Sequence, residues 1–285
     1  LQKEYRRQRQ MCIRDRMCCM TTDRNTNTFD VKSLVGKGNN DSLVLIDVRR
    51  EDEYKTGHIP NAVNLPLAKL LEDDKPENVA KLAGEIGISD DTTVVIYDDT
   101  FGALSSRVAW TLQYIGHNNV SLLEVTFSQW KERGLKVSTD IPSIKPTKHS
   151  INIQSDILAT ADYLENAKDK KNVVLIDNRE RLNFLENHIP GAINIKYRTL
   201  SNDGKIIRTK ESMKNFLKNR GIAEKSEIIT YCGSVGTLSG LAYYALKSAG
   251  LSNVKLYVRS FKEWKNLAKP IDKQEDAAYW DLSAE

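Results

Sequence analysis

Residues 173–195, VVLIDNRERLNFLENHIPGAINI, decide the fold, because a second copy of the same pattern stands 130 residues earlier. Residues 43–65 read LVLIDVRREDEYKTGHIPNAVNL and repeat the aspartate, the arginine, the His-Ile-Pro and the asparagine at that constant offset. Further along, residues 94–97 (VVIY) match residues 228–231 (IITY) at an offset of 134. Matches in this order and at this spacing do not arise by chance. The sequence therefore predicts two copies of one domain.

Each copy alternates short apolar runs with amphipathic stretches, the pattern of strands buried on both faces and of helices that cover them. We therefore predict an α/β fold of two tandem domains, each a mainly parallel sheet flanked by helices on both faces. The first domain is expected at residues 25–137 and the second at residues 151–285. Residues 138–150 carry Pro142 and Pro146 among polar side chains, cannot propagate a helix, and are expected to form the linker.

The net charge of the chain excludes one class of function. The formal charge is +4, but residues 1–24 hold seven Lys and Arg against three Asp and Glu, so the rest of the chain is neutral overall. Nucleic-acid binding needs a basic surface that releases phosphate counterions. No run of residues approaches the roughly 20 apolar residues of a membrane span. We expect neither a nucleic acid nor a membrane as partner.

Residues 1–24 are expected to be a disordered or spurious leader. They lack the apolar core of a secretory signal, and an Arg-rich transit peptide fits poorly with Glu4 and Asp15. Three of the four cysteines lie in this stretch, which leaves Cys232 alone in the body of the chain and allows no disulfide framework there. This cysteine usage favours a reducing compartment, so we predict a cytoplasmic location, with a mitochondrial one left open.

Cys232 stands where the apolar run 228–231 breaks into the glycine-punctuated turn 233–237. A buried face of a helix follows, with apolar residues at the required spacing: Leu238, Leu241, Ala242, Ala245, Leu246 and Ala249. The backbone amides of such a turn and the positive end of the helix dipole favour an anion, and so favour a reactive thiolate. A buried structural cysteine is the alternative. The order strand, glycine turn, helix favours chemistry.

The other polar residues of the repeat are predicted to be structural. Asp177, Arg179 and His188 each have a counterpart in the first copy, which has no cysteine at the equivalent place. We expect the Asp–Arg pairs to fix loops at strand ends and the histidines to support the fold. A metal site needs several convergent ligands, and none are spaced nearby. The sequence thus predicts no metal and no cofactor.

These motifs resemble the tandem-domain rhodanese family of sulfurtransferases, which includes thiosulfate and 3-mercaptopyruvate sulfurtransferases. The resemblance covers residues 29–270 and rests on the Asp–Arg pair, the HIPGAIN segment, the Tyr-Cys loop and the Phe-x-x-Trp at residues 261–264. It implies that the second domain is catalytic and that the first is an inactive copy. The sequence agrees, because Asp98 stands at the position that matches Cys232, and a carboxylate cannot carry a sulfane sulfur.

The chemistry implied by this resemblance is a ping-pong reaction. The Cys232 thiolate attacks the outer sulfur of a small-molecule donor and becomes a persulfide, and an acceptor then removes that sulfur. A thiol, cyanide or a thioredoxin-like protein can be the acceptor. The amides and hydroxyls expected to stabilise the charge on sulfur belong to five loop residues: Gly233, Ser234, Val235, Gly236 and Thr237.

The donor stays open between 3-mercaptopyruvate and thiosulfate. The loop holds no cation, which resembles mercaptopyruvate sulfurtransferases, and a donor carboxylate would then be held by Arg181, with Arg179 as the second candidate. Two departures from the family pattern bear on the donor. Val235 precedes Gly236 where the usual order is reversed, and Arg259 stands in a Val-Arg-Ser where many relatives have Asp-Gly-Ser.

Two other functions remain as alternatives. A phosphatase or arsenate reductase of the same fold would need an arginine one residue beyond the present loop, but Thr237 ends the loop and the next arginine is Arg259. A non-catalytic rhodanese-type interaction module would not need the retained cysteine. A dinucleotide site is disfavoured, because the glycines of this turn do not follow G-x-G-x-x-G.

Overall fold

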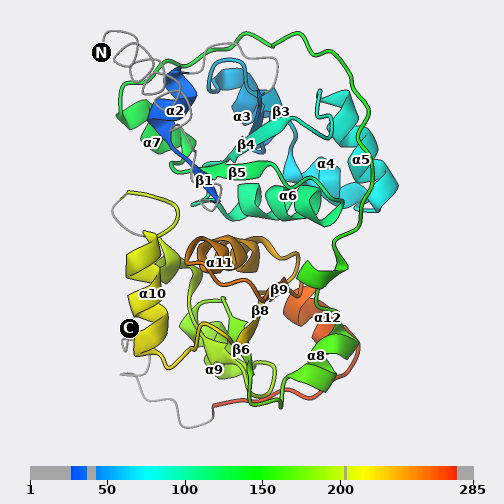
Figure 1. The fold of residues 1–285 in the computed structure, drawn as a ribbon, viewed down its shortest axis with the longest axis vertical. Helices are drawn as coiled ribbons and strands as arrows, with labels where there is room; N and C mark the ends of the chain where they lie inside the picture. Colours follow the sequence, from blue (N-terminus) through cyan, green and yellow to red (C-terminus); the bar gives the residue numbers. More distant parts are fainter. Residues whose placement is uncertain (1–26, 37–42, 202–203, 275–285) are drawn as a thin grey trace, which may run out of the picture.

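The computed structural model describes residues 27–36, 43–201 and 204–274 (Figure 1). The expected leader, residues 1–24, lies outside these ranges. Two parallel sheets, of five and four strands, build two α/β domains, which confirms the predicted fold class (Figure 1). None of the described helices is long and apolar enough to cross a bilayer.

The first sheet has the strand order β1-β5-β4-β2-β3, and all of its pairs are parallel. Its centre is formed by the apolar runs that the sequence pattern marked, because only strands covered on both faces can be apolar throughout. The five strands are β1 (Thr28–Phe29), β2 (Leu43–Asp47), β3 (Val63–Asn64), β4 (Thr93–Tyr97) and β5 (Val120–Leu123).

Side chains alternate between the two faces of this sheet, as the two-residue period of a strand requires. In β4, Val94 and Ile96 pack into one hydrophobic cluster, and Val95 and Tyr97 pack into another. The second cluster is covered by α2 (Val31–Gly36), α3 (Glu51–Thr56) and α7 (Phe127–Glu132). The first is covered by α4 (Leu67–Glu72), α5 (Pro76–Glu85) and α6 (Ala103–Tyr114).

The second sheet repeats this plan with the order β7-β6-β8-β9. Its strands are β6 (Val173–Asp177), β7 (Ile193–Asn194), β8 (Glu227–Tyr231) and β9 (Val254–Leu256). One face packs on α8 (Ala161–Ala167), α9 (Arg181–Glu186) and α12 (Ser260–Asn266). The other packs on α10 (Lys210–Asn219) and α11 (Thr237–Ser248). Two short 3-10 helices are η1 (Ser155–Ile157) and η2 (Tyr197–Leu200).

The register of the central strands repeats between the domains. Asp47 at the end of β2 pairs with Tyr97 of β4, and Asp177 at the end of β6 pairs with Tyr231 of β8. These are the residues related by the offsets of 130 and 134 in the sequence. The internal repeat is therefore a repeat of structure.

The two domains meet where α6 packs along α11 (Figure 1). One hydrophobic cluster runs through both domains across this contact. The helices approach closely at Gly240, where a Cβ would lie 3.1 Å from the Oγ of Ser106. Each domain therefore presents residues of its own α6 or α11 to the other.

The segment between the domains has no helix or strand from residue 139 to residue 154. It runs along the first domain, where the amide of Thr147 donates to the carbonyl of Gly84 and the amide of Asn152 donates to that of Ile115, at 2.9 and 2.8 Å. The exact domain boundaries stay a prediction.

Candidate active site

The Asp–Arg pairs hold loops at the ends of the central strands in both domains. Arg179 Nη2 lies 2.7 Å from Asp177 Oδ2 and donates to the carbonyl of Asn187 at 2.6 Å. Burial opposes the charge of Arg179, but the hydrogen bonds and the charge of Asp177 outweigh burial and raise the pKa of the guanidinium. Arg49 and Asp47 form the same pair at 2.5 Å. An arrangement present in both copies is structural, and it gives no support to Arg179 as a donor ligand.

Both histidines of the repeat also serve the fold. His58 Nδ1 lies 2.9 Å from the carbonyl of Tyr54, and the two rings stack with centroids 3.9 Å apart. His188 repeats this with Phe184, at 2.8 Å and 3.9 Å. Within the described residues, no group of three or more His, Cys, Asp or Glu side chains is arranged to hold a metal ion. Both rings are thus held by a hydrogen bond and a stacked ring within their own domain.

Cys232 follows the last residue of β8 and lies buried, with 2% of its surface exposed. Gly233, Ser234 and Val235 form the exposed crest of the turn, and α11 begins at Thr237. Gly236 has φ of +75°, and a Cβ there would lie 3.0 Å from Val258 Cγ2. The turn therefore requires glycine at this position. Gly233 has no positive φ and no atom within 4 Å of a Cβ, so its glycine is not required by the backbone.

Ser260 is a neighbour of the sulfur that sequence reasoning did not assign. Its Oγ accepts a hydrogen bond from the amide of Cys232 at 3.2 Å and lies 3.7 Å from the Sγ. The same hydroxyl donates to the carbonyl of Tyr257 at 3.0 Å. Ser260 is buried and has φ of +58°. The signal in the sequence was its place directly before the Phe-x-x-Trp motif.

The first domain supplies a second neighbour, Arg107 of α6. Its Nε donates to the carbonyl of Val235 at 2.8 Å, and its Nη2 lies 3.3 Å from Asp74 Oδ2. Asp74 also accepts from Arg259 Nη2, at 3.0 Å. Burial lowers the pKa of Arg107 to about 10, against the opposing charges of Asp74 and Cys232. No local sequence pattern indicates this contact, which joins residues 128 positions apart.

In the equivalent turn of the first domain, the backbone amides bind the side chain of Asp98. Asp98 is 1% exposed, and its carboxylate accepts hydrogen bonds of 2.8 to 3.0 Å from four backbone amides: those of Thr100, Gly102, Leu104 and Ser105. The carboxylate lies at the N-terminus of α6, where the helix dipole favours an anion. At the offset of 134, the equivalent amides belong to Ser234, Gly236, Leu238 and Ser239, and within the described residues no acceptor is bonded to any of the four.

Arg181, the predicted donor ligand, is the first residue of α9. This helix follows β6, whose last residue pairs with Tyr231, so Arg181 and Cys232 both follow the carboxyl ends of neighbouring parallel strands. Ligands of open α/β sheets bind at this edge. The guanidinium carbon of Arg181 lies 5.6 Å from the ring centroid of Phe184. Its role in donor binding stays a prediction.

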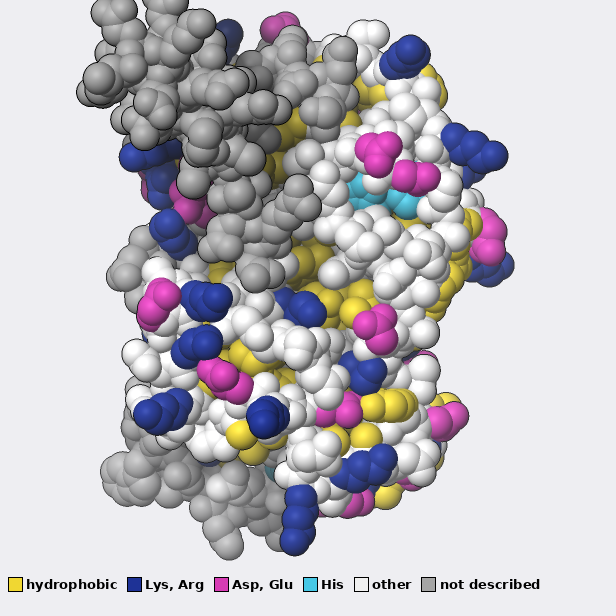
Figure 2. All heavy atoms as spheres, in the orientation of Figure 1, with side chains coloured by type: hydrophobic (Ala, Val, Ile, Leu, Met, Phe, Trp, Pro, Cys, Tyr) yellow, Lys and Arg dark blue, Asp and Glu magenta, His cyan; other side chains and the backbone are white. Residues whose placement is uncertain are grey.

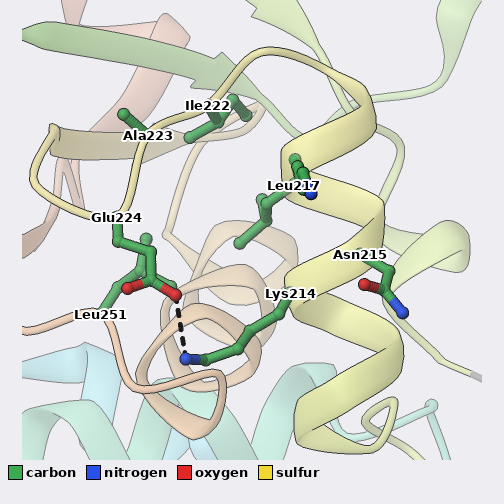
Figure 3. A pocket seen from close by; sticks show the side chains of 8 residues that line it. Lys214, Asn215, Leu217, Ile222, Ala223, Glu224 and Leu251 are labelled. Atoms are coloured by element: carbon green, nitrogen blue, oxygen red, sulfur yellow. Dashed lines mark hydrogen bonds and ion pairs between the residues drawn. The ribbon is translucent and has the colours of Figure 1, made fainter.

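Two hollows of the surface lie elsewhere. A cavity of about 300 Å³ is lined by α10 and the residues after it, where Lys214 and Glu224 form an ion pair at 2.9 Å (Figure 3). A larger groove of about 700 Å³ lies against β2 of the first domain. Neither is lined by Cys232. On the face in Figure 2, basic and acidic side chains are interspersed. Neither hollow is lined by a residue of the turn after β8.

Comparisons with known proteins agree with this architecture. A model of the Rhodanese-like domain matches residues 30–133 and 160–267. A 3-mercaptopyruvate sulfurtransferase of Mus musculus is 30% identical, covering 79% of this chain and 82% of the mouse protein. A thiosulfate sulfurtransferase of Azotobacter vinelandii is 27% identical, covering 79% of this chain and 88% of its own.

A solved structure shares the fold. The anaerobic ergothioneine biosynthesis enzyme from Chlorobium limicola, in complex with trimethyl histidine, superposes with a TM-score of 0.73 at 22% identity, covering 85% of this chain and 68% of that one. At this identity the likeness concerns the fold alone. The domain model, by contrast, matches both copies, and the mouse relative spans them. The chain belongs to the family of tandem rhodanese-domain sulfurtransferases.

Proposed function

We propose that this chain carries sulfane sulfur as a persulfide on Cys232, taken from 3-mercaptopyruvate or thiosulfate and passed to a thiol, cyanide or a thioredoxin-like acceptor. The observation that carries the proposal is the pair of equivalent turns. In the first domain the amides of the turn hold the carboxylate of Asp98. In the second, the same backbone surrounds a thiol, so an anionic sulfur at Cys232 would take the place of that carboxylate.

The first half-reaction forms the persulfide. The Cys232 thiolate attacks the outer sulfur of thiosulfate, an S–S bond forms, and sulfite leaves with the electron pair of the broken bond. With 3-mercaptopyruvate the C–S bond breaks instead, and the thiol proton is transferred to carbon, which gives pyruvate. The negative charge ends on the terminal sulfur, where the amides of residues 234–239 and the hydroxyls of Ser234 and Thr237 are proposed to bind it.

The second half-reaction restores the thiolate. A thiolate or cyanide attacks the terminal sulfur, the S–S bond breaks, and Cys232 keeps the electron pair. In the structure, Ser260 Oγ lies 3.7 Å from the Sγ of Cys232 and donates to the carbonyl of Tyr257. Rotation of its hydroxyl would let the single proton turn to the thiolate, which makes Ser260 a further proposed ligand of the sulfur.

The two proposed donors are supported by relatives named for each of them. Relatives named for 3-mercaptopyruvate and for thiosulfate have similar identity to this chain. Arg181 is the proposed ligand of the donor's carboxylate or sulfonate oxygens. The cytoplasmic location predicted from the cysteine usage belongs to the same proposal.

The test is turnover with each donor, in the presence of cyanide or dithiothreitol, by the full chain and by Cys232→Ser. We expect the substitution to abolish turnover, and a Cys12→Ser variant to keep it as the matched control. Equal turnover by Cys232→Ser would contradict the mechanism. Hydrolysis of a phosphoester without sulfur transfer would favour the phosphatase, and inertness toward all substrates would favour the interaction module.

A further inference from the structure

A buried cation from the first domain touches the turn that carries Cys232. Arg107 lies in α6, is 2% exposed, and its Nε donates to the carbonyl of Val235 at 2.8 Å. A guanidinium withdrawn from water needs charged and hydrogen-bonding partners to offset the cost of its burial. Arg107 therefore ties the crest of this turn to the other domain by a bond that only a long donor side chain can make.

The contact is absent from the equivalent place in the first domain. At the offset of 134 the counterpart of Arg107 is Leu241 of α11, and the counterpart of Gly236 is Gly102. A Cβ on Gly102 would lie 3.3 Å from Leu241 Cδ1, so the same helix position faces the equivalent turn there. The turn that holds the carboxylate of Asp98 is met by an apolar side chain, and the turn that holds the cysteine is met by a cation.

A second arginine joins this cation through a shared carboxylate. Asp74, from the loop between α4 and α5, lies 3.3 Å from Arg107 Nη2 and 3.0 Å from Arg259 Nη2. Two cations against one carboxylate leave an excess of one positive charge. The side chain of Arg259 is 59% exposed, whereas that of Arg107 is 2% exposed. Of the two positive charges, that of Arg107 is therefore buried at the domain contact, and that of Arg259 is accessible to solvent.

The exposed arm of this cluster is next in the chain to the residue that contacts the sulfur. Arg259 directly precedes Ser260, whose Oγ lies 3.7 Å from Cys232 Sγ. On the other side, Val258 packs against Gly236 of the turn. An exposed positive charge attracts anionic reagents and repels cationic ones, and salt weakens both effects. The loop lacks a cation of its own in sequence, and these two arginines supply one in space.

We propose that Arg107, Asp74 and Arg259 form a cross-domain site that selects anionic donors for Cys232. Arg259 attracts the anionic donor to the turn, in addition to the ligand role proposed for Arg181. Arg107 is a positioning residue that fixes the turn through Val235. Asp74 holds the two arginines in place and limits their net charge. This inference rests on the proposed function only in that both proposed donors are anions.

The test compares two alkylating reagents of nearly equal size, anionic iodoacetate and neutral iodoacetamide. The rate of modification of Cys232 in the full chain is followed by mass spectrometry of its peptide, so that the other cysteines do not interfere. The ratio of the iodoacetate rate to the iodoacetamide rate measures the preference for an anion. We expect Arg259→Gln to lower this ratio about threefold, and 0.5 M salt to lower it in the wild type.

Asp74→Asn gives a prediction of opposite sign, since it removes the single negative charge of the cluster and should raise the ratio about threefold. Arg107→Lys keeps the charge but loses the fork that reaches Val235, so it should slow both reagents by a similar factor and leave the ratio near that of the wild type. Lys218→Gln, an exposed charge removal on α10 away from Cys232, is the matched control and should change neither rate.

A ratio unchanged in both Arg259→Gln and Asp74→Asn would overturn the proposal, and so would a fall of the ratio in Asp74→Asn. Alkylation requires no sulfur transfer, so the result is independent of the proposed function. A chain with the expected ratios but no turnover would contradict the sulfurtransferase mechanism and leave the anion site standing.

Discussion

The turn at residues 98–102 and the turn at residues 232–236 have the same place in two copies of one domain, and they differ in what occupies the cradle. In the first, the carboxylate of Asp98 accepts hydrogen bonds from four backbone amides, so these amides already have a partner. In the second, a thiol stands at that place under an exposed crest, and a cation from the other domain holds the turn. The backbone after the central strand of the first domain binds an anion, and under the proposed function the residue at this place decides whether the anion is a fixed carboxylate or an exchangeable sulfur.

The largest effect is expected from making the second turn like the first. Cys232→Asp should abolish sulfur transfer, because a carboxylate cannot form a persulfide. The chain should still fold with a Tm no lower than that of the wild type, since the carboxylate can accept hydrogen bonds from the four equivalent amides of the second turn. Turnover and Tm are measured on one preparation. A Tm lower by 5 °C or more would show that the two cradles are not equivalent.

Substitution of Asp98 in the first turn should lower the stability of the chain and leave its activity nearly unchanged. Asp98→Ala leaves four amides without their acceptor, which we expect to destabilise the chain by about 2–4 kcal/mol. Asp98→Asn keeps an accepting oxygen for two of the amides but turns an NH2 donor toward the other two, so it should also destabilise the chain. Denaturant unfolding gives the free energies, and turnover at a temperature where all variants are folded should stay within about twofold of the wild type.

The control is a comparison of the loss of activity with the loss of stability in the Asp98 variants. Asp98 is in the domain without the cysteine, so an activity loss larger than the stability loss explains would mean that the first turn acts in the reaction. Such a result would contradict its role as scaffold.

The two glycines of the turn that carries Cys232 should differ in how much their substitution destabilises the chain. Gly236→Ala places a Cβ 3.0 Å from Val258 Cγ2 at φ of +75°, and should destabilise the chain by about 1–3 kcal/mol. Gly233→Ala meets no atom within 4 Å and no positive φ, so its stability should change by less than about 0.5 kcal/mol. Equal effects of the two substitutions on Tm would show that the turn adopts another conformation.

Acid stability is a further property in which the two domains should differ. His117 of the first domain is buried beside His149, and burial lowers its pKa to about 4. The unfolded chain therefore binds more protons than the folded chain between about pH 6.5 and 4, so stability is full above this window and falls as the pH falls through it. The second domain has the apolar Leu251 at the equivalent position.

The expected loss is about 1–3 kcal/mol across that window, measured by denaturant unfolding at successive pH values. His117→Gln should remove most of this slope, although it lowers stability at pH 7. A slope that persists in His117→Gln would assign the acid sensitivity to other groups.

Much of this fold could be predicted because the two copies share patterns of residues that are close together in the sequence. Apolar runs such as residues 228–231 mark buried strands, and the strand–glycine turn–helix order marks the turn at Cys232. The structural roles of His58 and of Asp98 followed from the comparison of the two copies. Each of these inferences used residues close in sequence or related by a constant offset.

The rest of the site depends on contacts that no local pattern contains. Arg107 meets Val235 only because α6 packs on α11, and Asp74 meets Arg259 across the same domain contact, 185 positions apart. Ser260 reaches Cys232 because the chain returns to the sheet edge 28 residues later. The sequence correctly showed a loop without a cation, but it could not show that two arginines are supplied from outside the loop.

The most direct test of the central claim is the mass of the Cys232 peptide after the full chain is incubated with each donor and no acceptor. The account predicts the addition of one sulfur atom to this peptide, its loss on addition of cyanide, and no such addition to any peptide of Cys232→Ser. An unmodified Cys232 with both donors, or sulfur bound only at another cysteine, would contradict it.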